Sequence, residues 1–150
     1  MALAIHVTVQ FSTDTDSPTA GEIIRWAKLA LDTKSNRAGD TTVRVVGDDE
    51  AKYLNEKWRR SAGPTNVLAF PAQGLELEPP LLGDIVICAS VANSEAQRDG
   101  KKNHAHWAHL VIHGTLHLLG YDHITDADAA NMEEQECSLL RELGYPDPYI

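Results

Sequence analysis

Residues 103–121 contain no Asp, Glu, Lys or Arg, although charged residues make up 23% of the chain. A stretch of this length is close to what a membrane-spanning helix requires, since roughly 20 apolar residues cross a bilayer. The stretch carries five histidines, however, and polar side chains are costly inside the hydrocarbon core of a membrane. We therefore expect a buried helix at the centre of a folded domain, surrounded by apolar residues.

The composition is that of a folded protein, because 150 residues with 43% hydrophobic side chains are enough for one domain with a substantial core. This argues against disordered, collagen-like and repeat proteins. The formal net charge of −9, from 13 basic and 22 acidic residues, argues against a protein that coats nucleic acid through bulk electrostatics. Any contact with nucleic acid must therefore be local.

Charge is distributed unevenly, and residues 122–150 contain eight acidic residues and one basic residue. A small basic group in the middle of the chain comprises Lys52, Lys57, Arg59 and Arg60. Taken alone, this distribution is typical of two solvated helix faces of opposite sign.

The two cysteines, Cys88 and Cys137, are far apart and match neither a disulfide framework nor a thiolate zinc site. We expect Cys88 to be a core residue. The N-terminal segment alternates apolar and polar side chains and lacks a basic region, which is typical of a strand rather than a signal peptide. These features predict a soluble protein of the reducing cytoplasm, with no membrane partner.

The periodicity of apolar residues predicts an α+β fold, with one domain over residues 1–150 and a mixed four-stranded sheet beside about five helices. Gly74–Pro80 is predicted to be a loop, because consecutive prolines neither donate ladder hydrogen bonds nor continue a helix. The strands are expected at Leu3–Phe11, Thr41–Val46, Val67–Phe70 and Ile85–Cys88, and the later helices at Ala51–Arg60, Ala89–Arg98, Ala105–Leu119 and Asp126–Leu143.

Two helix starts carry local signals. Ser17 and Pro18, followed by Glu22, predict that the first helix begins there with Pro18 in its first turn. Asp48 or Asp49 is expected to cap the second helix.

His113 and His117 are four residues apart, so on a helix their imidazoles share one face and can point at a common metal ion. This spacing alone is a weak indication. Gly120 follows, and a glycine just past a helix end can adopt the left-handed conformation that turns His123 back toward the other two. Three neutral nitrogens leave a fourth tetrahedral position for water, which is typical of a catalytic zinc ion. The sequence therefore predicts a metal site on the central helix and the turn after it.

The pattern His-x-x-x-His-x-x-Gly-x-x-His is also the ligand frame of metzincin proteases, in which a glutamate follows the first histidine. That glutamate acts as general base on the metal-bound water, and here its position is Gly114. The frame therefore supports a hydrolytic metal but not peptide cleavage of that type.

The polar neighbours of this pattern leave alternatives open. His109 lies one turn before His113 and is either a second-layer or substrate-binding group or a packed histidine. Asp122 either hydrogen bonds a ligand or water, or serves only as a turn residue. His104 and His106, near the start of the helix, are expected to be exposed.

The segment HGTLHLLGYDH, residues 113–123, resembles the signature of the YbeY family of metal-dependent endoribonucleases, which act in ribosomal RNA maturation. Two further segments are similar to family motifs, namely residues 54–71 and Leu82-Gly83-Asp84-Ile85. Ala69 stands where the family has serine, and Trp58 stands where tyrosine is commoner. The resemblance covers nearly the whole domain.

The resemblance implies one zinc ion bound by His113, His117 and His123, and a functionally important arginine at Arg59. From spacing alone, Arg59 is a solvated helix residue. A guanidinium can hold a phosphate through two parallel hydrogen bonds and stabilise the charge that develops during RNA cleavage, so the implied role is chemically sound.

The resemblance also implies a single-strand-specific endoribonuclease that matures the 3′ end of small-subunit ribosomal RNA and contributes to ribosome quality control. Its partners would be single-stranded ribosomal RNA and a ribosomal protein or ribosome-assembly GTPase. The sequence contains no obvious general base. Two alternatives stay open: a zinc hydrolase of another substrate class, such as a peptidase that uses Glu133 or Glu134 as base, and a noncatalytic ribosome-assembly factor with a structural metal.

Overall fold

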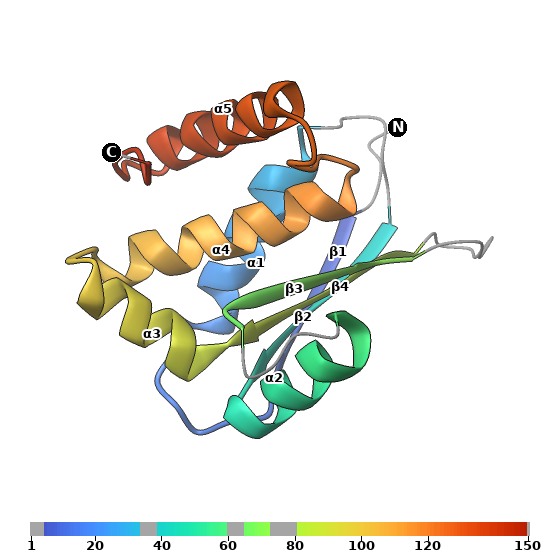
Figure 1. Cartoon of the computed structure of the whole chain (residues 1–150), viewed down its shortest axis with the longest axis vertical. Helices are drawn as coiled ribbons and strands as arrows, with labels where there is room; N and C mark the ends of the chain where they lie inside the picture. Colours follow the sequence, from blue (N-terminus) through green and yellow to red (C-terminus); the bar gives the residue numbers. More distant parts are fainter. Residues whose placement is uncertain (1–4, 34–38, 60–64, 73–80, 150) are drawn as a thin grey trace.

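The computed structural model describes residues 5–33, 39–59, 65–72 and 81–149, so the predicted loop at Gly74–Pro80 lies outside the described residues. Figure 1 shows the strands grouped in one sheet, with helices on both of its faces. The elements, in chain order, are β1 (Ile5–Phe11), α1 (Ala20–Leu31), β2 (Gly39–Val46), α2 (Asp48–Leu54), the π-helical turn η1 (Asn55–Arg59), β3 (Val67–Pro71), β4 (Leu81–Cys88), α3 (Ala89–Arg98), α4 (Asn103–Leu118) and α5 (Asp126–Glu142).

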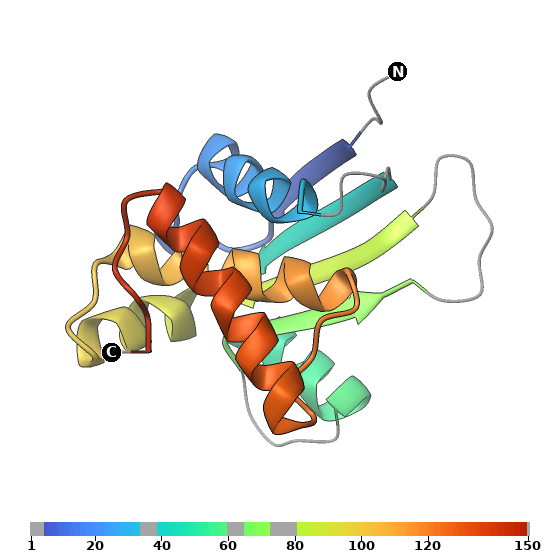
Figure 2. The same ribbon diagram turned by 90° about the horizontal axis from the view of Figure 1, so that it is seen from above.

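The sheet has the strand order β1-β2-β4-β3. β1, β2 and β4 are parallel, whereas β3 pairs antiparallel with β4 and forms one edge, as Figure 2 shows. Val43 of β2 and Ala69 of β3 both pair with Ile85 of β4, which fixes the register of the three strands. The predicted α+β fold is confirmed, with a mixed four-stranded sheet and five α-helices in the described part of the chain.

The larger core lies between the sheet and a layer formed by α1 and α4, and α5 packs on the outer side of α4 (Figure 1). Trp107, Ile112 and Leu116 of α4 are fully buried, and Ile85 and Ile87 of β4 belong to the same core. Each such side chain contributes roughly 1.5–3 kcal/mol by leaving water. The segment without charged residues is therefore a central helix that holds its histidines on a rigid support.

A smaller core lies on the opposite face of the sheet under α2, and it contains Val46, Ala51, Leu68, Val86 and Cys88. Cys88 is buried, as expected, and burial raises the pKa of its thiol. This cysteine is a packing residue of the sheet rather than part of the histidine cluster.

The start of α1 differs from the prediction. The Thr19 hydroxyl accepts a hydrogen bond from the Glu22 N–H at 3.2 Å, and the Glu22 carboxylate accepts one from the Thr19 N–H at 3.0 Å. These two bonds form a capping box, which makes Thr19 the N-cap. The prediction that Pro18 lies in the first turn is therefore wrong, because Pro18 precedes the cap.

The start of α2 also differs from the prediction. Asp48 and Asp49 lie inside the first turn, and the N-cap is Gly47, which has no side chain to bond the free amides. The two carboxylates stabilise the helix through its dipole instead. The helix predicted at Ala51–Arg60 is observed as α2 followed directly by η1, and Arg60 lies outside the described residues.

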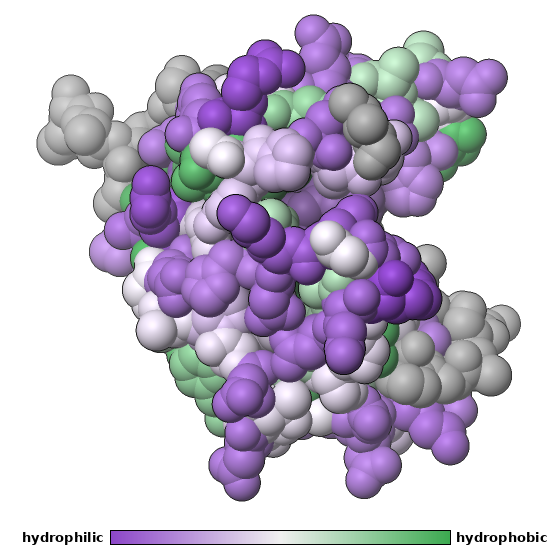
Figure 3. All heavy atoms as spheres, turned by 90° about the vertical axis from the view of Figure 1, so that its left-hand side faces the viewer, coloured by the Kyte–Doolittle hydropathy of each residue, from purple (hydrophilic) through white to green (hydrophobic). Residues whose placement is uncertain are grey.

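Hydrophilic residues cover most of the face that carries α3 and the start of α4, as Figure 3 shows. Large apolar side chains that are exposed include Trp58 and Ile124. Within the described ranges, no helix is both long and apolar enough to cross a bilayer.

Candidate metal centre

Three imidazoles converge at the C-terminal end of α4. His113 and His117 lie one turn apart on the helix, and His123 lies in the loop that follows it. The ring centroids are 4.7 Å apart for His113 and His117, 5.1 Å for His117 and His123, and 5.9 Å for His113 and His123. One ring nitrogen from each histidine lies within 4.8 Å of the other two, so the set can hold one cation.

The turn after α4 depends on Gly120, whose φ of 101° lies in the region that favours glycine. Its N–H donates to the His117 carbonyl at 3.1 Å, and the Tyr121 N–H donates to the Leu116 carbonyl at 3.1 Å. These bonds form a Schellman motif, which ends the helix and reverses the chain. His123 returns toward the helix by the mechanism that the sequence predicts.

Asp122 shapes the same turn. Its Oδ1 accepts a hydrogen bond from the Ile124 N–H at 3.2 Å, which closes an Asx turn around His123. Of the two alternatives for Asp122, the structure favours the turn residue.

One pair of donor atoms has the spacing of a tetrahedral cation site. His113 Nε2 and His117 Nε2 are 3.2 Å apart. Two nitrogens bound at roughly 2.0–2.1 Å to a tetrahedral zinc ion would be about 3.3 Å apart. Burial, and then the neighbouring His113 and His123, lower the pKa of His117, which favours the neutral imidazole that binds metals.

Glu136 of α5 supports His113 from behind. Its carboxylate is 1% exposed, and its Oε1 accepts a hydrogen bond from His113 Nδ1 at 3.1 Å. With the proton on Nδ1, the Nε2 lone pair of His113 faces His117. Burial acts to raise the pKa of Glu136, but hydrogen bonds from His109 and His113 outweigh burial and lower it to about 2. The carboxylate therefore stays ionised and holds one tautomer of His113.

His109 belongs to this second layer. Its Nε2 contacts Glu136 Oε2 and lies 3.3 Å from the Tyr149 hydroxyl, which itself donates to Glu136 Oε2 at 2.7 Å. Of the alternatives left open for His109, the structure thus shows a hydrogen-bonded position behind the three converging imidazoles.

The two histidines at the start of α4 differ. His104 is exposed, as expected, and its Nε2 lies 2.7 Å from Glu22. The prediction that His106 is exposed is wrong, because it is 7% exposed and its Nε2 lies 3.0 Å from Glu95 Oε1. Glu95 also accepts a hydrogen bond from the Asn66 side-chain amide at 3.1 Å. His106 therefore connects α4 with α3 and with the residue that precedes β3.

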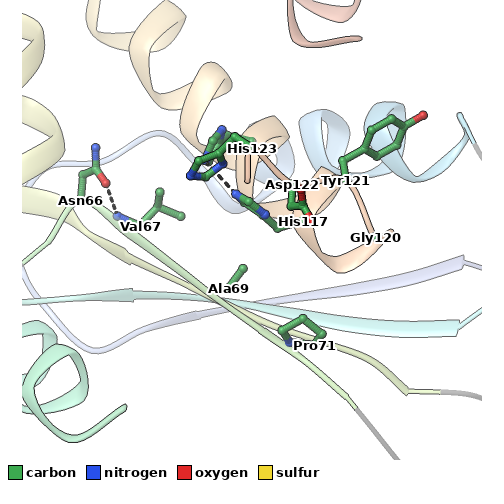
Figure 4. Close-up of a pocket in the computed structure, with 11 residues that line it drawn as sticks. Asn66, Val67, Ala69, Pro71, His117, Gly120, Tyr121, Asp122 and His123 are labelled. Atoms are coloured by element: carbon green, nitrogen blue, oxygen red, sulfur yellow. Dashed lines mark hydrogen bonds between the residues drawn. The ribbon is translucent and has the colours of Figure 1, made fainter. Parts of the chain in front are cut away.

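A cleft of about 570 Å³ opens beside the three histidines. Its other wall is β3, along which Val67, Ala69 and Pro71 lie opposite His117 and His123 (Figure 4). The side chains of His117 and His123 point toward one another. Because β3 is at the edge of the sheet and His123 is exposed, an extended substrate can reach the imidazoles from solvent.

Gly114 lies where α4 approaches the sheet most closely. A β-carbon at this position would lie 3.0 Å from Ile85 Cγ2 and 3.3 Å from Val67 Cγ2. Any larger residue would therefore press on these two side chains, which would have to shift by a few tenths of an ångström. The packing thus disfavours a glutamate at the position where metzincins place their base.

The model of the family Endoribonuclease YbeY matches residues 8–144. The chain belongs to the YbeY family. A curated relative named Endoribonuclease YbeY from Stutzerimonas stutzeri (strain A1501) is 50% identical over 149 residues, which cover 97% of this chain and 91% of the relative. Another protein of that name, from Nitrosococcus oceani, is 46% identical over 151 residues and covers 98% of both chains.

A solved structure is similar to this YbeY family member. The solution structure of TM1509 from Thermotoga maritima matches with a TM-score of 0.61 and 26% identity over 91% of this chain and 88% of that one. The arrangement of sheet and helices is therefore shared with an experimentally determined fold.

Arg59, which the YbeY resemblance marks as functionally important, is the last residue of η1, and its side chain lies outside the described residues. Its neighbour Lys57 is described, with Nζ 3.2 Å from the Tyr53 hydroxyl and 5.3 Å from the centre of the Trp58 ring. The role of Arg59 therefore stays a prediction.

Glu136 is the residue of this YbeY family member that sequence reasoning missed. The sequence pattern suggests Glu133 and Glu134 as candidate bases, whereas the structure leaves both exposed. The sequence does carry a signal for Glu136. This residue falls on the apolar stripe of α5, and a carboxylate on a buried face requires hydrogen-bond partners. The buried residues of that stripe are Met132, Glu136, Leu139 and Leu140.

Proposed function

We propose that this protein is a zinc-dependent endoribonuclease that cleaves single-stranded ribosomal RNA in the cytoplasm, with residues 1–150 acting as one domain. Its reaction matures the 3′ end of small-subunit ribosomal RNA and contributes to ribosome quality control. The observation that carries this proposal is the convergence of His113, His117 and His123 beside an open cleft, in a chain of the YbeY family.

The proposed ligands of one zinc ion are these three histidines. Three protein ligands leave a coordination position open, whereas structural zinc sites are closed by four. When bound, the ion supplies Lewis acidity toward a phosphodiester. The exposure of His123 and the cleft of about 570 Å³ beside it support a site that a substrate can enter.

The chain's own residues orient the site and the substrate. Glu136 holds the tautomer of His113 in which Nε2 faces the other two imidazoles. Arg59 is proposed to bind a phosphate with its guanidinium and to stabilise the charge that develops on the phosphate oxygens during cleavage. The neighbouring basic residues Lys57 and Arg60 support this placement of a phosphate-binding edge.

The cleft supports a single-stranded substrate. A single strand can splay its bases and bring one phosphate to the three histidines, whereas an A-form duplex presents a stiff, regular surface. With a net charge of −9, this chain can make only a few phosphate contacts, so its RNA binding is expected to depend weakly on salt. A ribosomal protein or a ribosome-assembly GTPase is the proposed partner that brings the enzyme to its substrate.

The proposal is tested by metal analysis and RNA cleavage on the same purified samples of the wild type, His117→Ala and Arg59→Glu. We expect about one zinc ion per chain in the wild type and Arg59→Glu, and none in His117→Ala. Only the wild type should cleave an unstructured RNA at the full rate. Contaminating nucleases are controlled by carrying the inactive variants through the same purification.

Two outcomes would replace the proposal with its alternatives. Cleavage of casein without cleavage of RNA would identify a zinc hydrolase of peptides. RNA cleavage by the wild type no faster than by His117→Ala and Arg59→Glu, together with unfolding of His113→Ala, would identify a structural metal in a noncatalytic assembly factor.

A further inference from the structure

The segment that follows α5 reaches back to the histidine cluster through Tyr149. The Tyr149 hydroxyl donates to Glu136 Oε2 at 2.7 Å, and its ring packs edge-on against His109 with the centroids 5.5 Å apart. Glu136 accepts a hydrogen bond from His113 at 3.1 Å through its other oxygen. An unbroken series of hydrogen bonds therefore joins this segment to a histidine of the cation site.

The position of Tyr149 is fixed from both sides. Lys101 Nζ, in the turn between α3 and α4, donates to the Pro148 carbonyl at 3.1 Å. The Asp147 carboxylate accepts hydrogen bonds from the Tyr149 N–H at 2.8 Å and from the Cys137 thiol at 3.4 Å. The hydroxyl is thus held at Glu136 by contacts that do not involve the histidines.

Glu136 needs its donors, because a buried carboxylate is stable only when hydrogen bonds replace its hydration. Its Oε1 is bonded by His113, and its Oε2 is bonded by both His109 and Tyr149. Without the Tyr149 hydroxyl, His109 alone would hold Oε2. The carboxylate would then be held less firmly against His113 Nδ1, and the tautomer and orientation of the His113 ring would be less strictly fixed.

We propose that Tyr149 is a positioning residue of the metal centre, which acts through Glu136 on His113 and thereby raises the affinity of the site for its cation. The inference rests on the proposed function, because it takes the three histidines as ligands of one divalent cation. Loss of a group that hydrogen bonds a metal ligand typically lowers metal affinity by about 10- to 100-fold. Tyr149 is one hydrogen bond further from the ligand than Glu136, so its own effect is smaller.

The test compares Tyr149→Phe with Glu136→Gln and with the control Tyr145→Phe, all in the full chain. Tyr145 belongs to the same segment and packs against the large core. Zinc affinity is measured by competition with a chromophoric chelator. We expect it to fall about fivefold in Tyr149→Phe and about 10-fold or more in Glu136→Gln, and to stay unchanged in Tyr145→Phe. Tyr149→Phe keeps the ring against His109 and removes only the hydroxyl.

A second measurement reports the tautomer directly. Nitrogen chemical shifts of isotope-labelled histidine in the zinc-free protein should place the proton of His113 on Nδ1 in the wild type and in Tyr145→Phe. Tyr149→Phe should show a mixture of both tautomers. Thermal unfolding of the same samples separates these effects from a loss of fold, which matters most for Glu136→Gln.

Equal zinc affinity in Tyr149→Phe and Tyr145→Phe, with the same His113 tautomer, would overturn the inference and leave the proposed function intact. Two cations per chain in the wild type, one of them lost in Glu136→Gln, would also overturn it. In that case Glu136 would be a ligand of a second site with His109 and His113, whose donor atoms also lie within 4.8 Å of one another. A wild type that binds no zinc at all would instead defeat the proposed function.

Discussion

The two halves of α4 use histidine for different purposes. In the first half, His106 is buried and its Nε2 is paired with Glu95, which ties α4 to α3. In the second half, His113 is also paired with a glutamate, but through Nδ1, so that its Nε2 faces His117. The two histidines differ in which ring nitrogen pairs with the glutamate. That choice decides whether the histidine links two helices or offers a lone pair to a cation.

The two halves also differ in how completely their polar atoms are satisfied. His106 Nδ1 is buried without a hydrogen-bond partner among the residues that the structure describes. Such an atom costs roughly 1–3 kcal/mol, so apolar packing must outweigh it in the first half. Beside the second half, both oxygens of Glu136 on α5 are bonded, which is the arrangement expected where geometry serves a site.

The largest effect is expected from the second half. His117→Ala should lower RNA cleavage by at least about 100-fold and abolish stoichiometric zinc binding, because two imidazoles hold the ion poorly. Chelation of the metal from the wild type should have the same effect, and added zinc should reverse it. The exposed His104→Ala in the first half is the matched control and should cleave RNA at the wild-type rate. An equal loss of RNA cleavage in His117→Ala and His104→Ala would show that the two halves of α4 do not differ in function.

Acid is expected to lower the stability of the folded protein through protonation of Glu136, which lies beside the second half of α4. Its pKa of about 2 in the folded protein lies below the ordinary value of 4.5, so its contribution is complete above about pH 4.5 and is lost as the pH falls toward 2. The full contribution is about 3 kcal/mol. Urea unfolding of the zinc-free protein at about pH 6 and about pH 3 should show a loss of about 2 kcal/mol, because protonation of Glu136 is incomplete at pH 3.

The control for this pH dependence is the exposed Glu133→Gln, which should keep the wild-type acid sensitivity. Glu136→Gln should lose most of it. If both variants lost stability in parallel with the wild type, the carboxylate of Glu136 would not be the group responsible.

His106→Ala should affect stability without affecting the metal. We expect the free energy of unfolding to fall by about 2 kcal/mol, because Glu95 loses a partner and a buried ring leaves a cavity. Zinc affinity should match that of the wild type in a chelator competition. A clear loss of affinity would mean that the first half of α4 also sets the position of the ligands.

The smallest effect on stability is expected at the glycines that follow two of the helices. Gly120 (φ 101°) and Gly144 (φ 83°) both follow a helix in the left-handed region, and a β-carbon at either would meet no described atom within 4 Å. Alanine at either position should therefore cost about 1 kcal/mol of stability through backbone strain. Gly120→Ala alone should also weaken zinc binding, since it displaces His123. Equal zinc affinities would show that His123 does not depend on this turn.

The sequence by itself determined the features that depend on residues close together in the chain. The spacing of His113, His117, Gly120 and His123 requires only the period of a helix and one left-handed residue, and both are properties of the local backbone. The long uncharged segment likewise predicts a buried α4, because its apolar residues surround the helix. Even so, a local signal can misplace the start of a helix. The sequence predicts Pro18 in the first turn of α1, whereas Thr19 is the N-cap.

The tertiary structure alone decided what surrounds the three imidazoles. Glu136 lies 23 residues from His113 in the sequence and meets it only because α5 packs along α4. The same holds for Gly114, whose lack of a side chain matters only where α4 meets the sheet. Such contacts follow from how the helices and sheet share one core, and no short stretch of sequence contains that information. The three imidazoles are therefore local in origin, whereas the hydrogen bonds that orient them are a product of the whole fold.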